Sequence, residues 1–177
     1  MVGIELKQRV AVITGGANGI GQATALTLAR AGAAVTIWDV EEQTGQAVVD
    51  AILAEGKQAA FVKVNVASQP DVEAAVAATV ERWGHIDILI NNAGILRDAQ
   101  LVKVKQGEVV GKMSEADWDA VIDVNLKGVF ICTQAVAPTM ITRQYGRIVN
   151  AASVVGLYGN FGQTNYVATK AGVIGMT

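Results

Sequence analysis

Apolar runs and amphipathic stretches alternate along most of the chain. Residues 10–13 are apolar and either β-branched or small, a composition typical of a strand buried on both faces of a parallel sheet. Glycines follow, and residues 19–31 then have the pattern of a helix. The same alternation predicts strands at 33–38, 59–64, 86–90 and 147–151, and helices at 41–55, 70–83, 114 to beyond 130, and 162–177. This order indicates one α/β domain, a Rossmann-type doubly wound parallel sheet with helices on both faces.

The segment 95–113 is the least regular part of the pattern. Between residues 101 and 112, valines partly alternate with lysines around Gly107, which favours a small hairpin or flap. The alternative is a surface insertion that takes no part in catalysis. The pattern leaves both interpretations open.

Closely spaced glycines join the first strand to the first helix in the sequence TGGANGIG, residues 14–21. Because glycine has no Cβ, the backbone at Gly15, Gly19 and Gly21 can approach a ligand closely, and the N–H groups that open the helix can point at a phosphate. Asp39 ends the second strand about 20 residues later, where a dinucleotide-binding fold holds the adenosine ribose. The alternative is a tight strand-to-helix turn that binds nothing.

Composition and charge exclude several classes of function. The 177 residues are 51% apolar and 17% charged, and their net charge is −2, so we expect neither a nucleic-acid partner nor an anionic membrane surface. The first nine residues have no signal-peptide pattern. No stretch reaches the roughly eighteen uninterrupted apolar residues of a membrane span. We therefore expect a cytoplasmic protein.

Cysteine and histidine usage argues against a disulfide framework and against a metal site. Cys132 is the only cysteine, and we expect it to be a small buried hydrophobe on the long helix. His85 is the only histidine, and it has no cysteine or paired carboxylates at ligand spacing. We therefore expect no metal site, and we expect His85 to lie on the surface in a turn.

Tyr166 and Lys170 are candidates for acid–base chemistry. They are four residues apart, so on a helix they share one face and can touch the same ligand. A lysine ammonium favours the phenolate form of a nearby tyrosine and so makes its hydroxyl a better proton-transfer group near neutral pH. The alternative is that the two residues share a helix face by accident.

Five motifs, in this order, resemble the short-chain dehydrogenase/reductase family: TGGANGIG at 14–21, NNAG at 91–94, Asn125, Ser153, and YVATK at 166–170. The resemblance implies a nicotinamide cofactor and no metal. It also implies cofactor contacts at Thr14, Gly15, Asn18, Gly19, Ile20, Gly21, Asp39, Asn65, Val66, Asn92, Ala93, Gly94, Tyr166 and Lys170.

The same resemblance implies a catalytic tetrad of Asn125, Ser153, Tyr166 and Lys170. Ser153 would hold the carbonyl oxygen of the substrate, and Tyr166 would exchange the proton on that oxygen. Lys170 would bind the nicotinamide ribose and favour the tyrosine phenolate, while Asn125 would hold a water that links the lysine to solvent. Taken singly, Asn125 is also compatible with a buried amide satisfied by backbone, and Ser153 with a turn residue.

Cofactor preference and substrate class are further expectations. Asp39 can accept hydrogen bonds from both ribose hydroxyls but would repel the 2′-phosphate of NADP, so we expect NAD(H) to be preferred. The sequences 123–130 and 150–177 are most similar to 3-oxoacyl-(acyl carrier protein) and acetoacetyl-CoA reductases, which implies a thioester substrate on CoA or an acyl carrier protein. Three features depart from those reductases: they usually prefer NADPH, the loop at 106–111 is longer, and Asn65 replaces a frequent aspartate.

The resemblance also bears on assembly and on the extent of the domain. It implies a homotetramer or homodimer. The family normally continues beyond the YxxxK helix with further strands and a substrate-covering lobe, so we expect the single domain at 1–177 to be incomplete at its C-terminal end. Two alternative functions stay open: another secondary-alcohol or sugar dehydrogenase of the family, and a nucleotide-binding protein without turnover.

Overall fold

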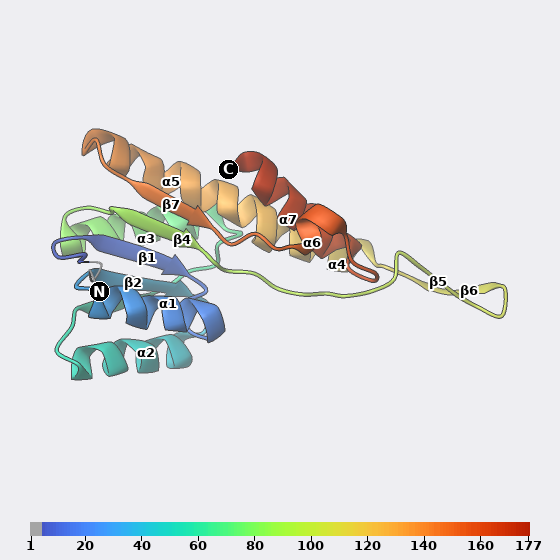
Figure 1. Cartoon of the computed structure of the whole chain (residues 1–177), viewed down its shortest axis with the longest axis horizontal. Helices are drawn as coiled ribbons and strands as arrows, with labels where there is room; N and C mark the ends of the chain where they lie inside the picture. The colour runs from blue at the N-terminus through green and yellow to red at the C-terminus, as the bar shows by residue number, and fades with distance from the viewer. Residues whose placement is uncertain (1–4) are drawn as a thin grey trace.

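Five parallel strands form the central sheet of the computed structural model, which describes residues 5–177 (Figure 1). They are β1 (Val10–Thr14), β2 (Ala34–Asp39), β3 (Ala59–Lys63), β4 (Ile88–Asn91) and β7 (Arg147–Asn150). The spatial order is β3-β2-β1-β4-β7, and each neighbouring pair is parallel. The strand order therefore reverses between β1 and β4, the position at which open α/β sheets bind their ligands. The predicted doubly wound sheet is confirmed.

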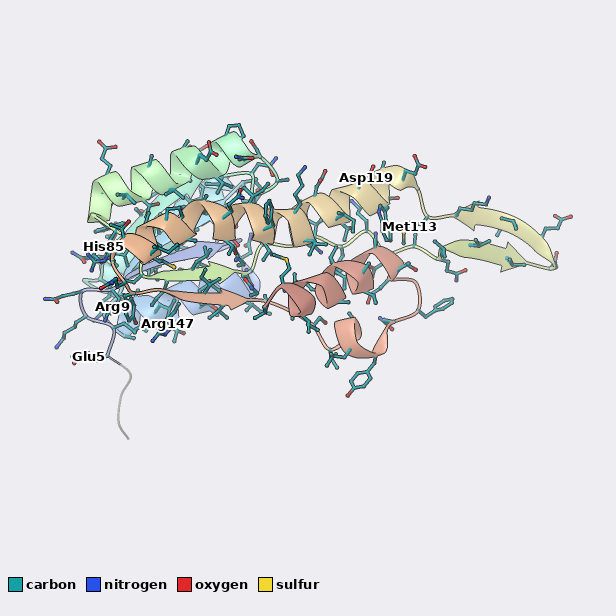
Figure 2. The ribbon with its side chains drawn as sticks, turned by 90° about the horizontal axis from the view of Figure 1, so that it is seen from above. Glu5, Arg9, His85, Met113, Asp119 and Arg147 are labelled. Atoms are coloured by element: carbon teal, nitrogen blue, oxygen red, sulfur yellow. The ribbon has the colours of Figure 1, made fainter. Side chains whose placement is uncertain are left out.

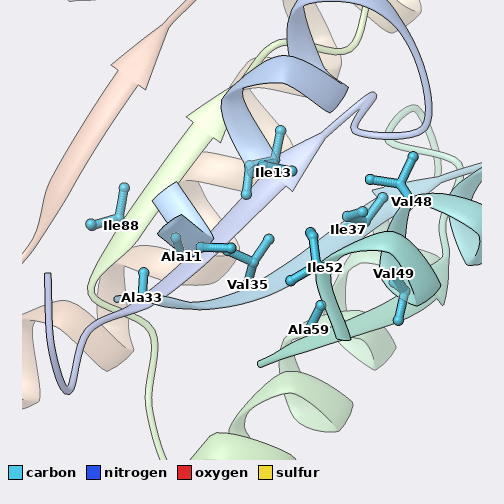
Figure 3. Packing of buried hydrophobic residues seen from close by; sticks show 12 residues of the cluster. Ala11, Ile13, Ala33, Val35, Ile37, Val48, Val49, Ile52, Ala59 and Ile88 are labelled. Carbon is cyan, nitrogen blue, oxygen red and sulfur yellow. The ribbon is translucent and has the colours of Figure 1, made fainter. Parts of the chain in front are cut away.

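Helices cover both faces of this sheet. Neighbouring residues of a strand point to opposite faces, so Ile13 packs with α1 (Gly19–Arg30) and α2 (Glu42–Ala54), while Val12 packs with α3 (Gln69–Trp83) and α5 (Gly128–Thr142). Figure 3 shows the first of these two cores, in which side chains of β1 and β2 meet those of α2. The strands of the sheet and the helices packed on it are all present where the sequence predicts them. Their ends differ from the predicted ends by at most two residues.

The long helix expected from residue 114 is interrupted. It comprises α4 (Glu115–Ile122), a π-helical turn at Asp123–Lys127 and α5. Ser114 caps its start by accepting the N–H of Asp117 at 3.0 Å. Single π-turns within α-helices are frequent at functional sites, and this one contains Asn125.

Taken together with its π-turn, the helical segment Glu115–Thr142 has the length and mean hydropathy of a membrane-crossing segment. Its apolar side chains Ile131, Cys132 and Val136 are buried in the second core against the sheet. Cys132 is fully buried, as expected. Burial of this face accounts for part of the apolar composition of the helix, whereas Phe130 and Ile141 are exposed.

A two-stranded hairpin projects from the body of the domain (Figure 1). It consists of β5 (Val102–Lys105) and β6 (Glu108–Lys112), joined by Gln106 and Gly107, whose φ angles of 52° and 84° are those of a type I′ turn. The predicted hairpin is thus confirmed. Its strands are solvent-exposed along almost their whole length.

After β7 the chain forms a short helix that the sequence pattern did not predict, α6 (Val155–Tyr158), and then α7 (Thr164–Met176). The two helices pack closely at Gly156, where a Cβ would lie only 2.7 Å from the backbone carbon of Lys170. The absence of a side chain at Gly156 permits this approach. The close packing holds the segment after β7 against the helix that carries Tyr166 and Lys170.

His85 lies in the connection between α3 and β4, as expected, but its side chain is more buried than a surface position implies. Its side chain is only 17% exposed, and its Nε2 lies 2.9 Å from the fully buried carboxylate of Asp87, at the start of β4. That carboxylate also accepts the N–H of Val10 at 3.0 Å and pairs with Arg9 at 3.4 Å. Figure 2 shows His85 and Arg9 beside each other at this end of the sheet. Burial beside a carboxylate was not evident from residue spacing alone.

Candidate active site

A cleft of about 450 Å³ opens where β1, β2 and β4 end. Nine of the expected cofactor-binding residues line it: Gly15, Asn18, Gly19, Asp39, Asn65, Val66, Asn92, Ala93 and Gly94. Six further lining residues were not predicted: Trp38, Val40, Glu41, Val64, Ile95 and Val124. Most of these six directly flank a predicted residue in the sequence, and that adjacency was the only signal for them.

The glycine-rich turn forms one wall of the cleft. Gly15 has a φ of 65°, and a Cβ there would lie 2.8 Å from the Cα of Ala93. A Cβ on Gly21 would overlap the carbonyl oxygen of Gly15. These positions accept only glycine. The absence of a Cβ lets this turn, which leads into α1, lie close to the NNAG segment at residues 91–94.

Thr14 and Asn92 tie these two segments together. The Thr14 hydroxyl oxygen accepts the N–H groups of Asn92 and Ala93, both at 3.0 Å. The Asn92 amide donates to the carbonyl oxygens of Thr14 at 3.2 Å and Gly15 at 3.1 Å. Thr14 is buried and does not line the cleft, so its observed contacts fix the shape of the cleft.

Asp39 lies at the end of β2 and faces the glycine-rich turn. Its two carboxylate oxygens accept the N–H of Ala17 at 2.9 Å and the N–H of Glu41 at 3.1 Å. Each oxygen has a second lone pair that can still accept a hydrogen bond from a ligand hydroxyl. The carboxylate is therefore both fixed in place and available at the edge of the cleft.

Tyr166 and Lys170 lie on α7, outside the lining of this cleft, and face each other. The Lys170 ammonium lies 5.5 Å from the centroid of the Tyr166 ring. It donates a hydrogen bond to the carbonyl oxygen of Ala151, two residues before Ser153. Lys170 is 5% exposed, and burial lowers its pKa. The Ser153 hydroxyl accepts the N–H of Val155 at 3.4 Å, so the serine belongs to the turn that starts α6.

Asn125 is fully buried in the π-turn. Its side-chain oxygen accepts the N–H of Ile95 at 2.8 Å, and its amide donates to the carbonyl of Ile95 at 2.9 Å. Both polar groups of the side chain are thus used by one backbone residue directly after NNAG. The side chain of Asn125 therefore also fits the interpretation as a buried amide that is satisfied by backbone groups.

Two other expected contacts lie away from the cleft lining. Ile20 is 78% exposed on the first turn of α1, and Gly21 lies under Gly15. Among residues 5–177, no three histidine, cysteine or acidic side chains form a group that could hold a metal ion.

Comparison with known proteins shows the family of the chain. The family model described as short chain dehydrogenase matches residues 9–177. The chain belongs to the short chain dehydrogenase family. It is 49% identical over 98% of its length to the 3-oxoacyl-(acyl-carrier-protein) reductase FabG of Thermotoga maritima, of which it covers 67%. It is 45% identical over 97% of its length to BbsD of Thauera aromatica, a hydroxy(phenyl)methylsuccinyl-CoA dehydrogenase subunit, of which it covers 65%.

A solved structure shares the fold. The crystal structure of gox2181 superposes with a TM-score of 0.88 at 36% identity, over 98% of this chain and 65% of that chain. This short chain dehydrogenase sequence therefore spans about two thirds of the length of the relatives that it matches.

Proposed function

We propose that the protein is an NAD(H)-dependent oxidoreductase that interconverts 3-oxoacyl and 3-hydroxyacyl thioesters, carried on CoA or an acyl carrier protein. The observation that carries this proposal is the buried Lys170 ammonium 5.5 Å from the Tyr166 ring, on a helix packed beside the cleft end of the sheet. The names of the two relatives above both describe enzymes of thioester substrates. That shared feature supports the substrate class.

The cleft suits an adenine dinucleotide. A backbone cradle that would not accommodate a Cβ at Gly15 or Gly21 leaves N–H groups at the start of α1 for a pyrophosphate. Asp39 would accept hydrogen bonds from the adenosine ribose, and Asn92 to Gly94 would face the nicotinamide half. When bound, the dinucleotide supplies or accepts the hydride.

The residues on α7 and after β7 would handle the proton. In the reduction, the carbonyl carbon gains a hydride, and its oxygen takes the hydroxyl proton of Tyr166, which gives the alcohol. The Lys170 ammonium would stabilise the resulting phenolate, and the Ser153 hydroxyl would hold the substrate oxygen. Since the side chain of Asn125 is engaged by Ile95, a water bound there would have to use the Asn125 backbone carbonyl.

We infer preference for NAD(H) from the carboxylate of Asp39. A 2′-phosphate placed where the ribose hydroxyls bind would meet a like charge, and nothing in the cleft lining offers a compensating cation, because none of its residues is lysine or arginine. The related 3-oxoacyl reductases usually use NADPH, so this inference opposes the expectation from resemblance and can be decided by measurement.

Turnover of acetoacetyl-CoA with NADH, followed by the loss of NADH absorbance, tests the proposed function. We expect activity in the unmodified protein and a loss of at least about 100-fold in Tyr166→Phe, the lower range for loss of a general acid–base group, with NADH affinity retained. Tyr145→Phe is the matched control, because Tyr145 lies at the opposite end of the sheet under Arg9. Equal turnover in Tyr166→Phe would refute the assigned role. Preferred turnover of simple ketones or sugars would favour another dehydrogenase, and NADH binding without any turnover would favour a non-catalytic protein.

A further inference from the structure

Asn165, directly before Tyr166, is a fully buried polar side chain. Its amide nitrogen donates to the carbonyl oxygens of Arg97 at 2.9 Å and Asp117 at 3.2 Å. Its side-chain oxygen accepts the N–H of Tyr166 at 2.8 Å. One side chain thus joins the first turn of α7 to two other segments of the chain.

Those two segments flank the projecting hairpin, and we call them its limbs: residues 95–101 before β5 and residues 113–117 after β6. Arg97 lies before β5, and Asp117 lies after β6 in the first turn of α4. The amide of Asn165 therefore closes the base of the hairpin and attaches it to the catalytic helix.

Neighbouring contacts hold the first limb in the same place. The Gln163 amide donates to the carboxylate of Asp98 at 2.8 Å, and Gln163 also forms an isolated β-bridge with Ala99. The start of this limb is fixed by the two hydrogen bonds between Asn125 and Ile95. Of these contacts, only those of Asn165 bind both limbs and the backbone of Tyr166 at once.

We propose that Asn165 is a positioning residue for the reaction, which sets the place of the Tyr166 hydroxyl by holding the start of α7 to both limbs of the hairpin. The inference rests on the proposed function, in which Tyr166 transfers the proton. Asn165 does not itself touch the substrate; it acts through Tyr166. An amide is required because the site needs one acceptor for an N–H and a donor of two hydrogens for two carbonyls.

Asn165→Asp separates the acceptor role of the side chain, toward the N–H of Tyr166, from its donor role toward the two carbonyls. An ionised aspartate can still accept the N–H of Tyr166, but it has no hydrogen to donate and places a negative charge against two carbonyl oxygens. Asn165→Ser can donate one hydrogen bond and leaves the site uncharged. We expect kcat to fall by up to about 100-fold in Asn165→Asp, because a displacement of about 1 Å at a reacting group can cost that factor. Asn165→Ser should lie between this variant and the unmodified protein.

The readouts distinguish positioning from loss of folded protein. We expect full stoichiometric NADH binding and a KM for acetoacetyl-CoA close to that of the unmodified protein. The solvent deuterium isotope effect on kcat should increase, because transfer of the Tyr166 proton becomes slower. Gln46→Glu is the matched control, an amide-to-acid change at an exposed residue of α2 whose side chain donates only to Asp50.

Three results would overturn the inference. The first is that both Asn165 variants fold, bind NADH and retain kcat within about twofold, a change of less than about 0.5 kcal/mol in the barrier. The second is that neither variant folds, which would give Asn165 a role in folding alone. The third is equal turnover in Tyr166→Phe, which would refute the proposed function and this inference together. If Tyr166→Phe loses activity and the Asn165 variants do not, this inference is refuted and the proposed function stands.

Discussion

Replacing Asp39 by asparagine should relax the discrimination between NADH and NADPH. The substitution removes the negative charge at the edge of the cleft while it preserves the size of the side chain. The asparagine oxygen can still accept one of the two N–H groups that now bind the carboxylate, those of Ala17 and Glu41. The local turn should therefore persist, and the change in affinity should report mainly on charge.

The size of the effect follows from Coulomb's law. A unit charge about 4 Å from Asp39 costs about 1 kcal/mol in water and about 4 kcal/mol at an effective dielectric constant of 20. These energies correspond to a preference for NADH of about fivefold to about 1,000-fold. Because Asp39 lies at the mouth of an open cleft, we expect a value between these limits, and most of it should vanish in Asp39→Asn.

Binding of both cofactors can be followed by the change in tryptophan fluorescence, since Trp38 adjoins the cleft. The quantity of interest is the ratio of the two Kd values in each variant at one fixed ionic strength, because salt screens the repulsion. Asp50→Asn is the matched control, as Asp50 is exposed on α2 and pairs only with Gln46. Tighter binding of NADPH than NADH by the unmodified protein would show that Asp39 does not set the cofactor preference, as would an unchanged ratio in Asp39→Asn.

Three further predictions concern stability, reactivity and the hairpin. Asp87→Asn should lower the free energy of unfolding by about 2 to 3 kcal/mol, measured by urea denaturation, because it removes a buried charge paired with Arg9; an unchanged midpoint would contradict this. Burial raises the pKa of Cys132 to about 12, so its thiol should not react with a disulfide reagent at pH 8 until the protein unfolds, and rapid labelling of the native protein would contradict this. Replacing residues 103–111 by a short glycine linker should preserve NADH affinity, because no residue of the hairpin lines the cleft, and a large loss would show that it contributes to binding.

Most of the sheet and its helices could be predicted because their signals are local. Runs such as Val10–Thr14 are apolar throughout, and the glycines after them have no alternative to a tight turn. The hairpin turn was also visible, because Gly107 stands between two stretches of alternating valine and lysine.

The features that escaped prediction depend on contacts between distant segments. The π-turn at Asn125 reads as ordinary helix in sequence, and only its pairing with Ile95 marks it. Asn165 is unremarkable beside Tyr166 until the limbs of the hairpin are placed next to it. Asp87 directly precedes the apolar strand β4, and beside its near neighbour His85 it pairs with Arg9 and Arg143 from distant parts of the chain.

In the proposed reaction, hydride passes directly between a nicotinamide and the 3-carbon of an acyl thioester. The most direct test incubates the protein with acetoacetyl-CoA and NADH that carries deuterium at the transferable position of the nicotinamide, and then analyses the product by mass spectrometry. We expect 3-hydroxybutyryl-CoA with one deuterium on the carbon that bears the hydroxyl. Product without deuterium at that carbon, or no product while NADH remains bound, would contradict it.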